Sequence, residues 1–339
     1  MKKNFNPMRN FHVPTYLKPG DSVIAIATSG VVKDISALEA GLDIWRSRGY
    51  KVTLDDNWNA QKGYLAGDDK TRRNALIQAW NDPQYKAILC IRGGYGSARL
   101  FQLSVNSDQK CDPADASSAK ERVLPEGLSV QNNSILLPSA LCPLPSKKWI
   151  IGFSDITALL WSLAKEEIAS LHGPILTTLA KEPLWSQERM FNYIEGKNIK
   201  PLQGKGWGGG TAEGILLPAN LSVATHILGT PLQPNLQGTI LALEDVTEYP
   251  YRIDRMLTQW RLMGILSGVK GIALGRFSRC EPYTGSVSFT VEEVLRDRLD
   301  DLGIPIVSEL PFGHDGTNAV LPVGHYVKLD GDRGELSFS

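Results

Sequence analysis

The chain has 339 residues and a formal net charge of zero, and 42% of its residues are hydrophobic. This length is enough for two domains of ordinary size. The charge balance gives no basic stripe of the kind that binds nucleic acid, and no apolar run is long enough for a membrane span. We therefore expect neither a nucleic-acid partner nor a membrane partner.

The N-terminus and the cysteines favour an intracellular protein. Residues 1–7 contain two lysines with no apolar segment after them, so no signal peptide is predicted. The four cysteines (Cys90, Cys111, Cys142 and Cys280) form no C-x-x-C pair. These features are typical of a soluble protein of the cytoplasm.

The first hundred residues predict alternating strands and helices. Strands are expected at 22–27, 51–54 and 85–91, where apolar and β-branched residues run together. Helices are expected at 35–45 and 69–80, where apolar residues recur at spacings of three and four. This alternation is typical of a parallel sheet with crossover helices, in which functional sites form at the carboxyl ends of the strands.

A glycine-rich loop, Arg92-Gly-Gly-Tyr-Gly96, follows the third of these strands. It has neither the G-x-G-x-x-G spacing of a dinucleotide fold nor the lysine and hydroxyl of a P-loop, so it indicates a nucleotide only weakly. Glycines let the backbone approach a ligand closely and turn its N–H groups toward an anion or an oxyanion. A tight turn without a ligand is the alternative.

Residues 104–147 interrupt the alternation. They are rich in Ser, Asn, Asp and Pro and have neither helical nor strand periodicity. A segment of this length without elements is unusual inside a compact domain. We interpret it as an exposed insertion, mobile or partly disordered, with a lid over a site as the alternative.

Ser154 lies at a predicted strand-to-helix turn. A strand is expected at 149–151, Gly152 ends it, and apolar residues recur with helical spacing from Asp155 onward. A serine at such a turn exposes its hydroxyl beside the positive end of a helix, as in the nucleophile elbow of a hydrolase. An ordinary helix N-cap is the alternative, because Ile156 stands where the elbow motif has its second glycine.

The second half of the chain is expected to mix strands and helices. The domain boundary is predicted in 171–200, a linker region with one helix near 187–195, between a domain of residues 1–170 and a domain of residues 201–339. Strands are expected at 211–217, 239–244, 269–275 and 304–310, and helices at 220–228, 253–260 and 290–299.

Of the five histidines, His314 is the one in a glycine-flanked loop after a strand, where functional side chains are usually presented. His172 precedes Gly-Pro in a turn, and His226 lies in an apolar helix. No pair of histidines has the spacing of metal ligands, so no metal site is predicted. Because geometry and not chain order defines a catalytic triad, the sequence alone leaves Ser154, a strand-end acid and His314 as a suggestion.

Four motifs occur in a specific order across residues 20–330. They are Ile91-Arg-Gly-Gly-Tyr-Gly-Ser97, Gly152-Phe-Ser-Asp-Ile-Thr-Ala158, Leu243-Glu-Asp-Val-Thr-Glu-Tyr-Pro-Tyr-Arg252 with Arg255-Met-Leu257, and Pro311-Phe-Gly-His-Asp-Gly316. Together they resemble the LD-carboxypeptidase family of serine peptidases, which includes murein tetrapeptide carboxypeptidases and microcin C self-immunity hydrolases.

This resemblance implies an α/β fold with an N-terminal Rossmann-like parallel-sheet domain, a C-terminal mixed β-rich α/β domain and an active site between them. It implies that Ser154 is the nucleophile, Glu244 the acid and His314 the histidine of a triad. Backbone N–H groups of Asp155 and Gly94 are then expected to form the oxyanion hole. No cofactor and no metal are implied, and family members are often homodimers.

The implied reaction hydrolyses the bond between the L-centre of a diamino acid and the terminal D-alanine of a murein tetrapeptide, in cell-wall recycling. The murein peptide is therefore the expected partner. A related hydrolase of microcin C-like peptidyl-nucleotide conjugates is one alternative, and it needs an aromatic or basic wall that the sequence does not assign. A non-catalytic small-molecule binding protein is the alternative from another class.

An exopeptidase must also recognise the free carboxylate of the residue that leaves. Arg92 opens the glycine loop at the neighbouring strand end, so it is the candidate cation. A structural ion pair is the alternative for this arginine.

The chain departs from the family pattern in two places. The segment 104–147 is longer than the usual connection, and Leu217-Pro-Ala-Asn220 replaces what is usually Gly-Gly-Asn. The second departure concerns the expected local substrate contacts and leaves the expected triad unchanged.

Overall fold

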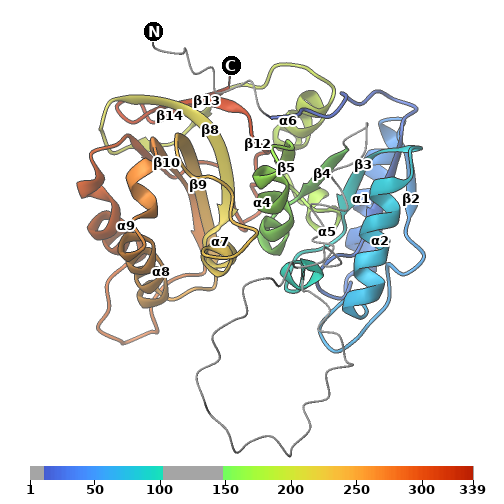
Figure 1. Cartoon of the computed structure of the whole chain (residues 1–339), viewed down its shortest axis with the longest axis horizontal. Coiled ribbons are helices and arrows are strands. Elements are labelled where there is room, and N and C mark those ends of the chain that lie inside the picture. Colours follow the sequence, from blue (N-terminus) through green and yellow to red (C-terminus); the bar gives the residue numbers. More distant parts are fainter. Residues whose placement is uncertain (1–10, 102–147, 339) are drawn as a thin grey trace, which may run out of the picture.

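The computed structural model describes residues 11–101 and 148–338, which form two β-sheets side by side with helices packed on them (Figure 1). The segment 104–147, expected to be an insertion, lies outside the described residues. The helices are α1 (Ile35–Ser47), α2 (Asp69–Asn81), α4 (Thr157–Lys165), α5 (Leu176–Leu179), α6 (Leu184–Ile194), α7 (Leu221–Ile227), α8 (Pro250–Leu262) and α9 (Val291–Leu299).

The first sheet contains the alternating elements predicted for the N-terminal part of the chain. Its strands are β1 (Ser22–Ile26), β2 (Lys51–Leu54), β3 (Tyr85–Cys90), β4 (Trp149–Gly152), β5 (Ser170–His172) and β12 (Leu321–Val323), in the order β12-β5-β4-β3-β1-β2. All neighbours are parallel except β12, which is antiparallel to β5. This pattern confirms the parallel-sheet prediction for this part.

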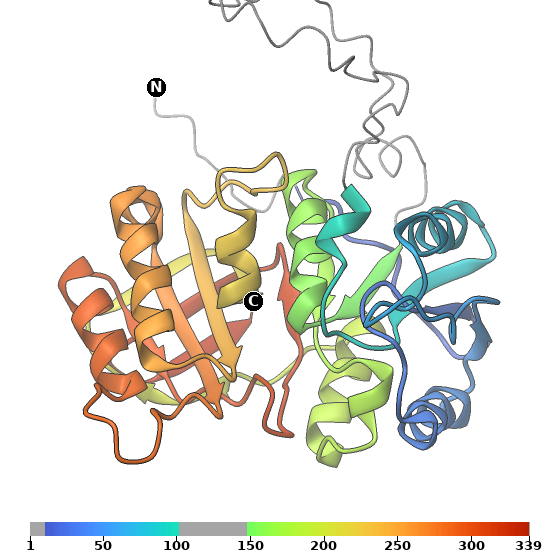
Figure 2. The same cartoon turned by 90° about the horizontal axis from the view of Figure 1, so that it is seen from below.

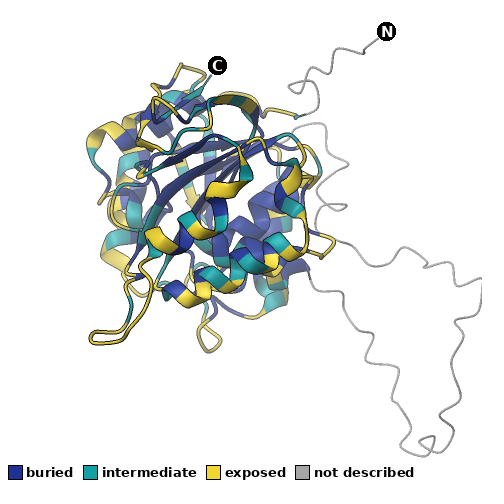
Figure 3. Ribbon diagram, turned by 90° about the vertical axis from the view of Figure 1, so that its left-hand side faces the viewer, coloured by how far each residue is buried: buried dark blue, intermediate teal, exposed yellow. Residues whose placement is uncertain are grey.

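Helices cover both faces of the first sheet, which explains why its central strands β1, β3 and β4 are mostly apolar and buried. Ile24 and Ile26 of β1 pack in one cluster with residues of α2 and α4. Val23 and Ala25, which alternate with them, pack in a second cluster with residues of α1, α5 and α6. In Figure 3, which views the molecule from the side of the second sheet, the strands are likewise buried, and exposed residues lie on the outer faces of the helices and in loops.

The second sheet is mixed. Its strands are β6 (Leu202–Gln203), β7 (Lys205–Gly206), β8 (Thr211–Asn220), β9 (Thr239–Val246), β10 (Gly271–Ser278), β11 (Ile306–Ser308), β13 (Tyr326–Asp330) and β14 (Glu335–Phe338), in the order β6-β14-β13-β8-β9-β10-β11-β7. The strands β8, β9, β10 and β11 are parallel to one another, and each strand outside them is antiparallel to its neighbour on the inner side. The expected mixed α/β architecture is thereby confirmed.

The chain between 171 and 200, expected as a linker region, is built into the first half of the molecule. It contains the end of β5, then α5 and α6. Phe191 and Ile194 of α6 are fully buried, and both belong to the cluster that α1 forms with the sheet. The apolar residues of α6 recur at helical spacing, so the segment covers the sheet where a linker would be exposed.

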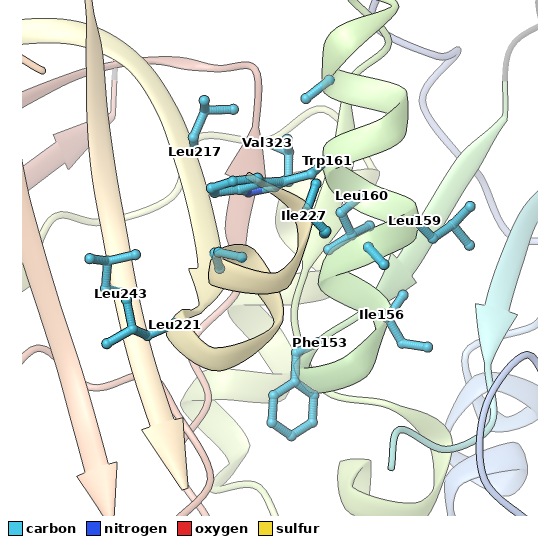
Figure 4. Close-up of a cluster of buried hydrophobic side chains, with 14 of the residues drawn as sticks. Phe153, Ile156, Leu159, Leu160, Trp161, Leu217, Leu221, Ile227, Leu243 and Val323 are labelled. Atoms are coloured by element: carbon cyan, nitrogen blue, oxygen red, sulfur yellow. The ribbon is translucent and has the colours of Figure 1, made fainter. Parts of the chain in front are cut away.

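The two sheets share one hydrophobic core. Helix α4 of the first half lies against β8 and α7 of the second (Figures 1 and 2). In Figure 4, Trp161 and Leu160 of α4 belong to the same buried cluster as Leu217 of β8 and Leu243 of β9. The Trp161 indole N–H also donates to the carbonyl of Pro218 at 3.0 Å. This shared core fixes the position of one sheet relative to the other.

Candidate active site

Ser154 occupies a strained turn between β4 and α4. Phe153 is extended (φ −150°, ψ −173°), Ser154 has φ +64°, and a 3₁₀ turn over Ser154–Ile156 leads into the helix. A positive φ is rare for a residue other than glycine and is often found at functional sites. Gly152 makes the sharp turn possible, because a methyl group there would lie 2.9 Å from the Ile156 side chain.

The three residues of the expected triad form a continuous line of hydrogen bonds. His314 Nε2 lies 3.0 Å from Ser154 Oγ, and His314 Nδ1 lies 2.6 Å from Glu244 Oε2. Glu244 is fully buried, and 15% of the His314 side chain is exposed. A buried carboxylate beside Nδ1 favours the proton on that nitrogen, which leaves Nε2 free to accept the serine proton.

The Phe153 ring packs between the imidazole of His314 and a second imidazole, that of His172. The Phe153 ring lies 4.7 Å from the His314 ring, centroid to centroid, and the ring of His172 lies 6.0 Å from Phe153. His172 is fully buried. Burial, and secondarily the charge of His314, lower the pKa of His172 to about 3, so this second imidazole stays neutral beside the site.

Asn220, at the end of β8, organises the acidic part of the site. Its Nδ2 donates to Glu244 Oε1 at 3.3 Å and to Asp245 Oδ1 at 3.0 Å. Asp245 also accepts from the backbone N–H of Ser222 at 2.9 Å. Burial, followed by the nearby charge of Glu244, raises the pKa of Asp245 to about 6. The Asn220 backbone N–H donates to Thr157 Oγ1 at 3.0 Å, which joins β8 to the start of α4.

The glycine loop lies against the Ser154 turn. A methyl group at Gly93 would be 3.2 Å from Ser154 Cβ, and Gly94 has φ +112°. Ser97 ties the two segments together: its backbone N–H donates to Asp155 Oδ2 at 2.8 Å, and its hydroxyl donates to the Asp155 carbonyl. The segments that carry the N–H groups of Asp155 and Gly94, the expected oxyanion donors, therefore both adjoin Ser154.

Arg92, the first residue of this loop, packs against the segment that contains Gly30 and Val31. Its Nη1 donates to the backbone carbonyl of Val31. A methyl group at Gly30 would lie 3.0 Å from that Nη1, and one at Gly94 would lie 4.0 Å from Arg92 Cζ. Within 11–101 and 148–338, no carboxylate forms an ion pair with Arg92. The guanidinium thus packs on the glycine loop.

Several supporting contacts were not anticipated from the sequence. The sequence places Glu244 and Asp245 at a strand end, but it does not predict the hydrogen bonds from Asn220 to both carboxylates. Ser97 directly follows the glycine loop, which was the available signal for its contact with the serine turn. Among the described residues, no cluster of His, Cys, Asp and Glu has an arrangement that could hold a metal ion.

Two family models match the chain. The LD-carboxypeptidase N-terminal domain matches residues 23–111, and the LD-carboxypeptidase C-terminal domain matches residues 213–329. A protein of Synechocystis sp. named "Putative carboxypeptidase" is 50% identical over 330 residues, which are 97% of this chain and 98% of that protein. The murein tetrapeptide carboxypeptidase of Pseudomonas aeruginosa is 28% identical over 330 residues, 93% of this chain and 95% of that one.

Solved structures agree with this relationship. The muramoyltetrapeptide carboxypeptidase of Oxalobacter formigenes is similar with a TM-score of 0.72 and 26% identity, over 93% of this chain and 97% of that one. The microcin self-immunity protein MccF in complex with glutamyl sulfamoyl guanosine has a TM-score of 0.77 at 21% identity, over 96% and 98% of the two chains, and shares the fold. The protein therefore belongs to the LD-carboxypeptidase family of serine peptidases.

Proposed function

We propose that this enzyme removes the terminal D-alanine from murein tetrapeptides, with Ser154 as nucleophile, His314 as general base and Glu244 as the acid that orients it. The observation that carries the proposal is the line of contacts from Ser154 Oγ to His314 Nε2 (3.0 Å) and from His314 Nδ1 to Glu244 (2.6 Å). The substrate class is supported by the name of the Pseudomonas aeruginosa relative, murein tetrapeptide carboxypeptidase.

In the first half of the reaction, His314 Nε2 takes the hydroxyl proton as Ser154 Oγ attacks the carbonyl carbon of the scissile peptide bond. Glu244 stabilises the imidazolium that results. The backbone N–H groups of Asp155 and Gly94 hold the negative oxygen of the tetrahedral intermediate, and losing one such donor typically lowers kcat by about 100- to 1,000-fold. The imidazolium then protonates the amine of D-alanine, and the peptide bond breaks.

In the second half, a water molecule replaces D-alanine. His314 removes a proton from the water as the water oxygen attacks the acyl-Ser154 ester. Collapse of the second tetrahedral intermediate breaks the ester bond and returns the proton to Ser154 Oγ. The products are a tripeptide with a new carboxylate and the regenerated enzyme.

Mass spectrometry after incubation with purified murein tetrapeptide tests this proposal. We expect a tripeptide and free D-alanine in equal amounts from the wild-type enzyme, and neither product from Ser154→Ala. More than a trace of turnover by Ser154→Ala would show that Ser154 is not the nucleophile. Covalent labelling of Ser154 by a serine-directed phosphonate supplies an independent readout.

A second substrate class, an acyl-sulfamoyl nucleoside, has an observation in its favour. The rings of Tyr249 and Tyr283 stack with centroids 4.1 Å apart, and Arg252 Cζ lies 5.7 Å from the Tyr249 ring. Tyr249 and Arg252 follow β9, the strand that carries Glu244, and Tyr283 follows β10, so the cluster combines aromatic and basic groups with the chemistry of a nucleobase platform. Hydrolysis of glutamyl sulfamoyl adenosine, with no release of D-alanine from the tetrapeptide, would favour this second class.

Three further properties belong to the same proposal: a role in cell-wall recycling, a cytoplasmic location and a homodimeric state. None of the described helices is long and apolar enough to cross a bilayer. Light scattering coupled to size-exclusion chromatography tests the dimer, and fractionation of the producing cell tests the location. A mass of one chain at micromolar concentration would contradict the homodimer.

A further inference from the structure

His314 is carried by residues 311–319, which we call the histidine loop and which lead from β11 in the second sheet to β12 in the first. The backbone N–H of Ala319 donates to the carbonyl of Pro311 at 2.9 Å and closes the base of the loop. Gly313, next to His314, has φ +130°, a conformation that other residues rarely adopt. The position of the imidazole therefore depends on contacts that hold this particular loop conformation.

One flank of the histidine loop is held by Arg276 of β10. The backbone N–H of Arg276 donates to the carbonyl of Phe312 at 2.9 Å, and its guanidinium pairs with Asp315 at 2.9 Å. Both side chains of this pair are about one third exposed. Exposed ion pairs contribute little to stability, typically about 0–1 kcal/mol, so this flank alone defines the loop weakly.

The other flank is buried and more firmly bonded. Asn318 is 1% exposed, and its Oδ1 accepts from the backbone N–H of Gly313 at 3.2 Å. The backbone N–H of Asn318 donates to Glu182 Oε2 at 2.8 Å. Glu182 is 5% exposed, lies between α5 and α6, and also accepts from Ser186 Oγ at 2.9 Å. A chain of hydrogen bonds thus runs from α6 to the peptide next to His314.

A buried carboxylate is costly unless its oxygens are well bonded. Burial raises the pKa of Glu182, and the hydrogen bonds from Asn318 and Ser186 oppose that rise. Hydrogen bonds to an ionised oxygen are shorter and about twice as strong as those between neutral groups. Glu182 therefore links the first half of the molecule to the histidine loop. The first half carries Ser154, and the loop carries His314.

We propose that Glu182 and Asn318 are positioning residues. The Glu182–Asn318 bond sets the place of the histidine loop relative to the Ser154 turn, and the Asn318 amide oxygen fixes the Gly313 peptide beside the imidazole. The proposal rests on the proposed function, because it concerns the alignment of His314 as the base for Ser154. Misplacing a catalytic group by 1 Å can lower the rate by about 100-fold.

The test measures kcat and KM on murein tetrapeptide, with active sites counted by phosphonate titration. We expect Asn318→Ala and Glu182→Leu to lower kcat per titrated site by about 10- to 100-fold with KM changed by less than about 3-fold. Glu182→Gln keeps an acceptor oxygen of the same shape and should retain most of kcat. Glu188→Leu removes an exposed carboxylate of α6 that pairs with Arg48, and should leave kcat unchanged.

Several outcomes overturn the proposal. One is a kcat per titrated site within about 2-fold of wild type in both Asn318→Ala and Glu182→Leu, with melting temperatures alone lowered. A second is an equal loss in Glu182→Gln and Glu182→Leu. If Glu182→Leu does not fold, Asn318→Ala decides, since it leaves the Glu182 bond to the backbone in place. Activity retained by Ser154→Ala would instead overturn the proposed function, so the two failures are distinguishable.

Discussion

At the scale of single residues, the backbone of Ser154 carries a conformational cost. A left-handed conformation costs an L-residue about 1–2 kcal/mol, and Ser154 adopts it with φ +64°. The turn places the hydroxyl between the His314 imidazole and the glycine loop. Strain of this kind persists only where surrounding contacts impose it, and here Gly152, Ser97 and Asp155 supply those contacts.

This cost can be measured with two inactive variants. Ser154→Gly should be more stable than Ser154→Ala by about 1 kcal/mol, because glycine adopts positive φ without steric penalty, partly offset by its greater freedom in the unfolded chain. Both variants should lack hydrolytic activity. Denaturant unfolding gives the two free energies. Equal stabilities, or a more stable alanine variant, would show that the turn is not strained.

His172 should make the folded protein sensitive to acid. Its folded-state pKa is lowered to about 3, whereas an unfolded histidine titrates near 6.5. Between these values the unfolded chain binds a proton that the folded chain does not, so the stability present above about pH 6.5 is lost as the pH falls. Neither ring nitrogen has a hydrogen-bond partner among the described residues, so His172→Leu sacrifices no such bond.

We therefore expect His172→Leu to match wild type in melting temperature at pH 7 and to exceed it at pH 4.5. Calorimetric scans at the two pH values provide the measurement. The same fall in melting temperature for both proteins would contradict the role assigned to the buried imidazole.

Arg92 can be tested as the group that recognises the leaving carboxylate. If it binds this carboxylate, Arg92→Ala should raise KM for the free-acid peptide by about 10- to 100-fold, the range for a hydrogen bond to a charged group. The matched C-terminal amide has no charge to lose and should be affected much less. Since Arg92 also bonds to the Val31 carbonyl, an equal loss on both substrates would assign it a structural role.

At the scale of elements, strand β10 packs tightly against the start of the histidine loop. A methyl group at Gly275 would lie 2.5 Å from both the ring and the carbonyl oxygen of Phe312, the residue two positions before His314. Gly275→Ala must therefore displace the loop. We expect a loss of about 1–3 kcal/mol in stability, together with a fall in kcat of about 10-fold or more.

Gly303→Ala is a matched control for this variant. Gly303 has φ +64° and no atom near the position of an added methyl group, so the substitution strains the backbone without a collision. It should lower stability by about 1 kcal/mol and leave kcat per folded molecule unchanged. Urea denaturation and steady-state kinetics on both variants separate the two effects. A normal kcat in Gly275→Ala would mean that the loop tolerates the displacement.

Long elements with strong periodicity were predictable from the sequence. The first-sheet strands at 22–27 and 85–91 and the helix at 69–80 agree with β1, β3 and α2 to within one residue at each end. The strand expected at 304–310 is only Ile306–Ser308 in the structure, and Pro305 directly precedes it. Strands of two or three residues, such as β6, β7 and β12, are too short to show an apolar periodicity in the sequence. Only their pairing with neighbouring strands defines them.

The candidate site likewise contains residues that the sequence predicts and contacts that it does not. Ser154 and His314 stand in recognisable local contexts, a strand-to-helix turn and a glycine-flanked loop, and the family resemblance supplied Glu244. The bond between Glu182 and Asn318 joins positions 136 residues apart. No local pattern predicts such a contact, since it exists only after the sheets have been placed relative to each other.

At the scale of the whole molecule, the shared core couples the two halves. Trp161 of α4 is fully buried in the cluster that contains Leu217 and Leu243 of the second sheet, and it donates to Pro218. The two sheets should therefore unfold in one cooperative transition. Trp161→Ala should lower the free energy of unfolding by about 3–5 kcal/mol.

Differential scanning calorimetry tests this coupling. We expect a single peak whose calorimetric and van't Hoff enthalpies agree, in wild type and in Trp161→Ala. Two separated peaks in the wild-type protein would mean that each half is an independent folding unit.

The position of β12 in the chain affects how the protein folds during synthesis on the ribosome. Residues 321–323 form an edge strand of a sheet whose other strands all lie before residue 173. During synthesis, the strands before residue 173 emerge well before β12, and until β12 pairs with β5 that edge of β5 is open to stray pairing. The imidazole of His314 arrives in the same late stretch. A nascent chain that ends before residue 314 therefore lacks the imidazole that we propose as the base for Ser154, and it should not hydrolyse peptides until the histidine loop has emerged.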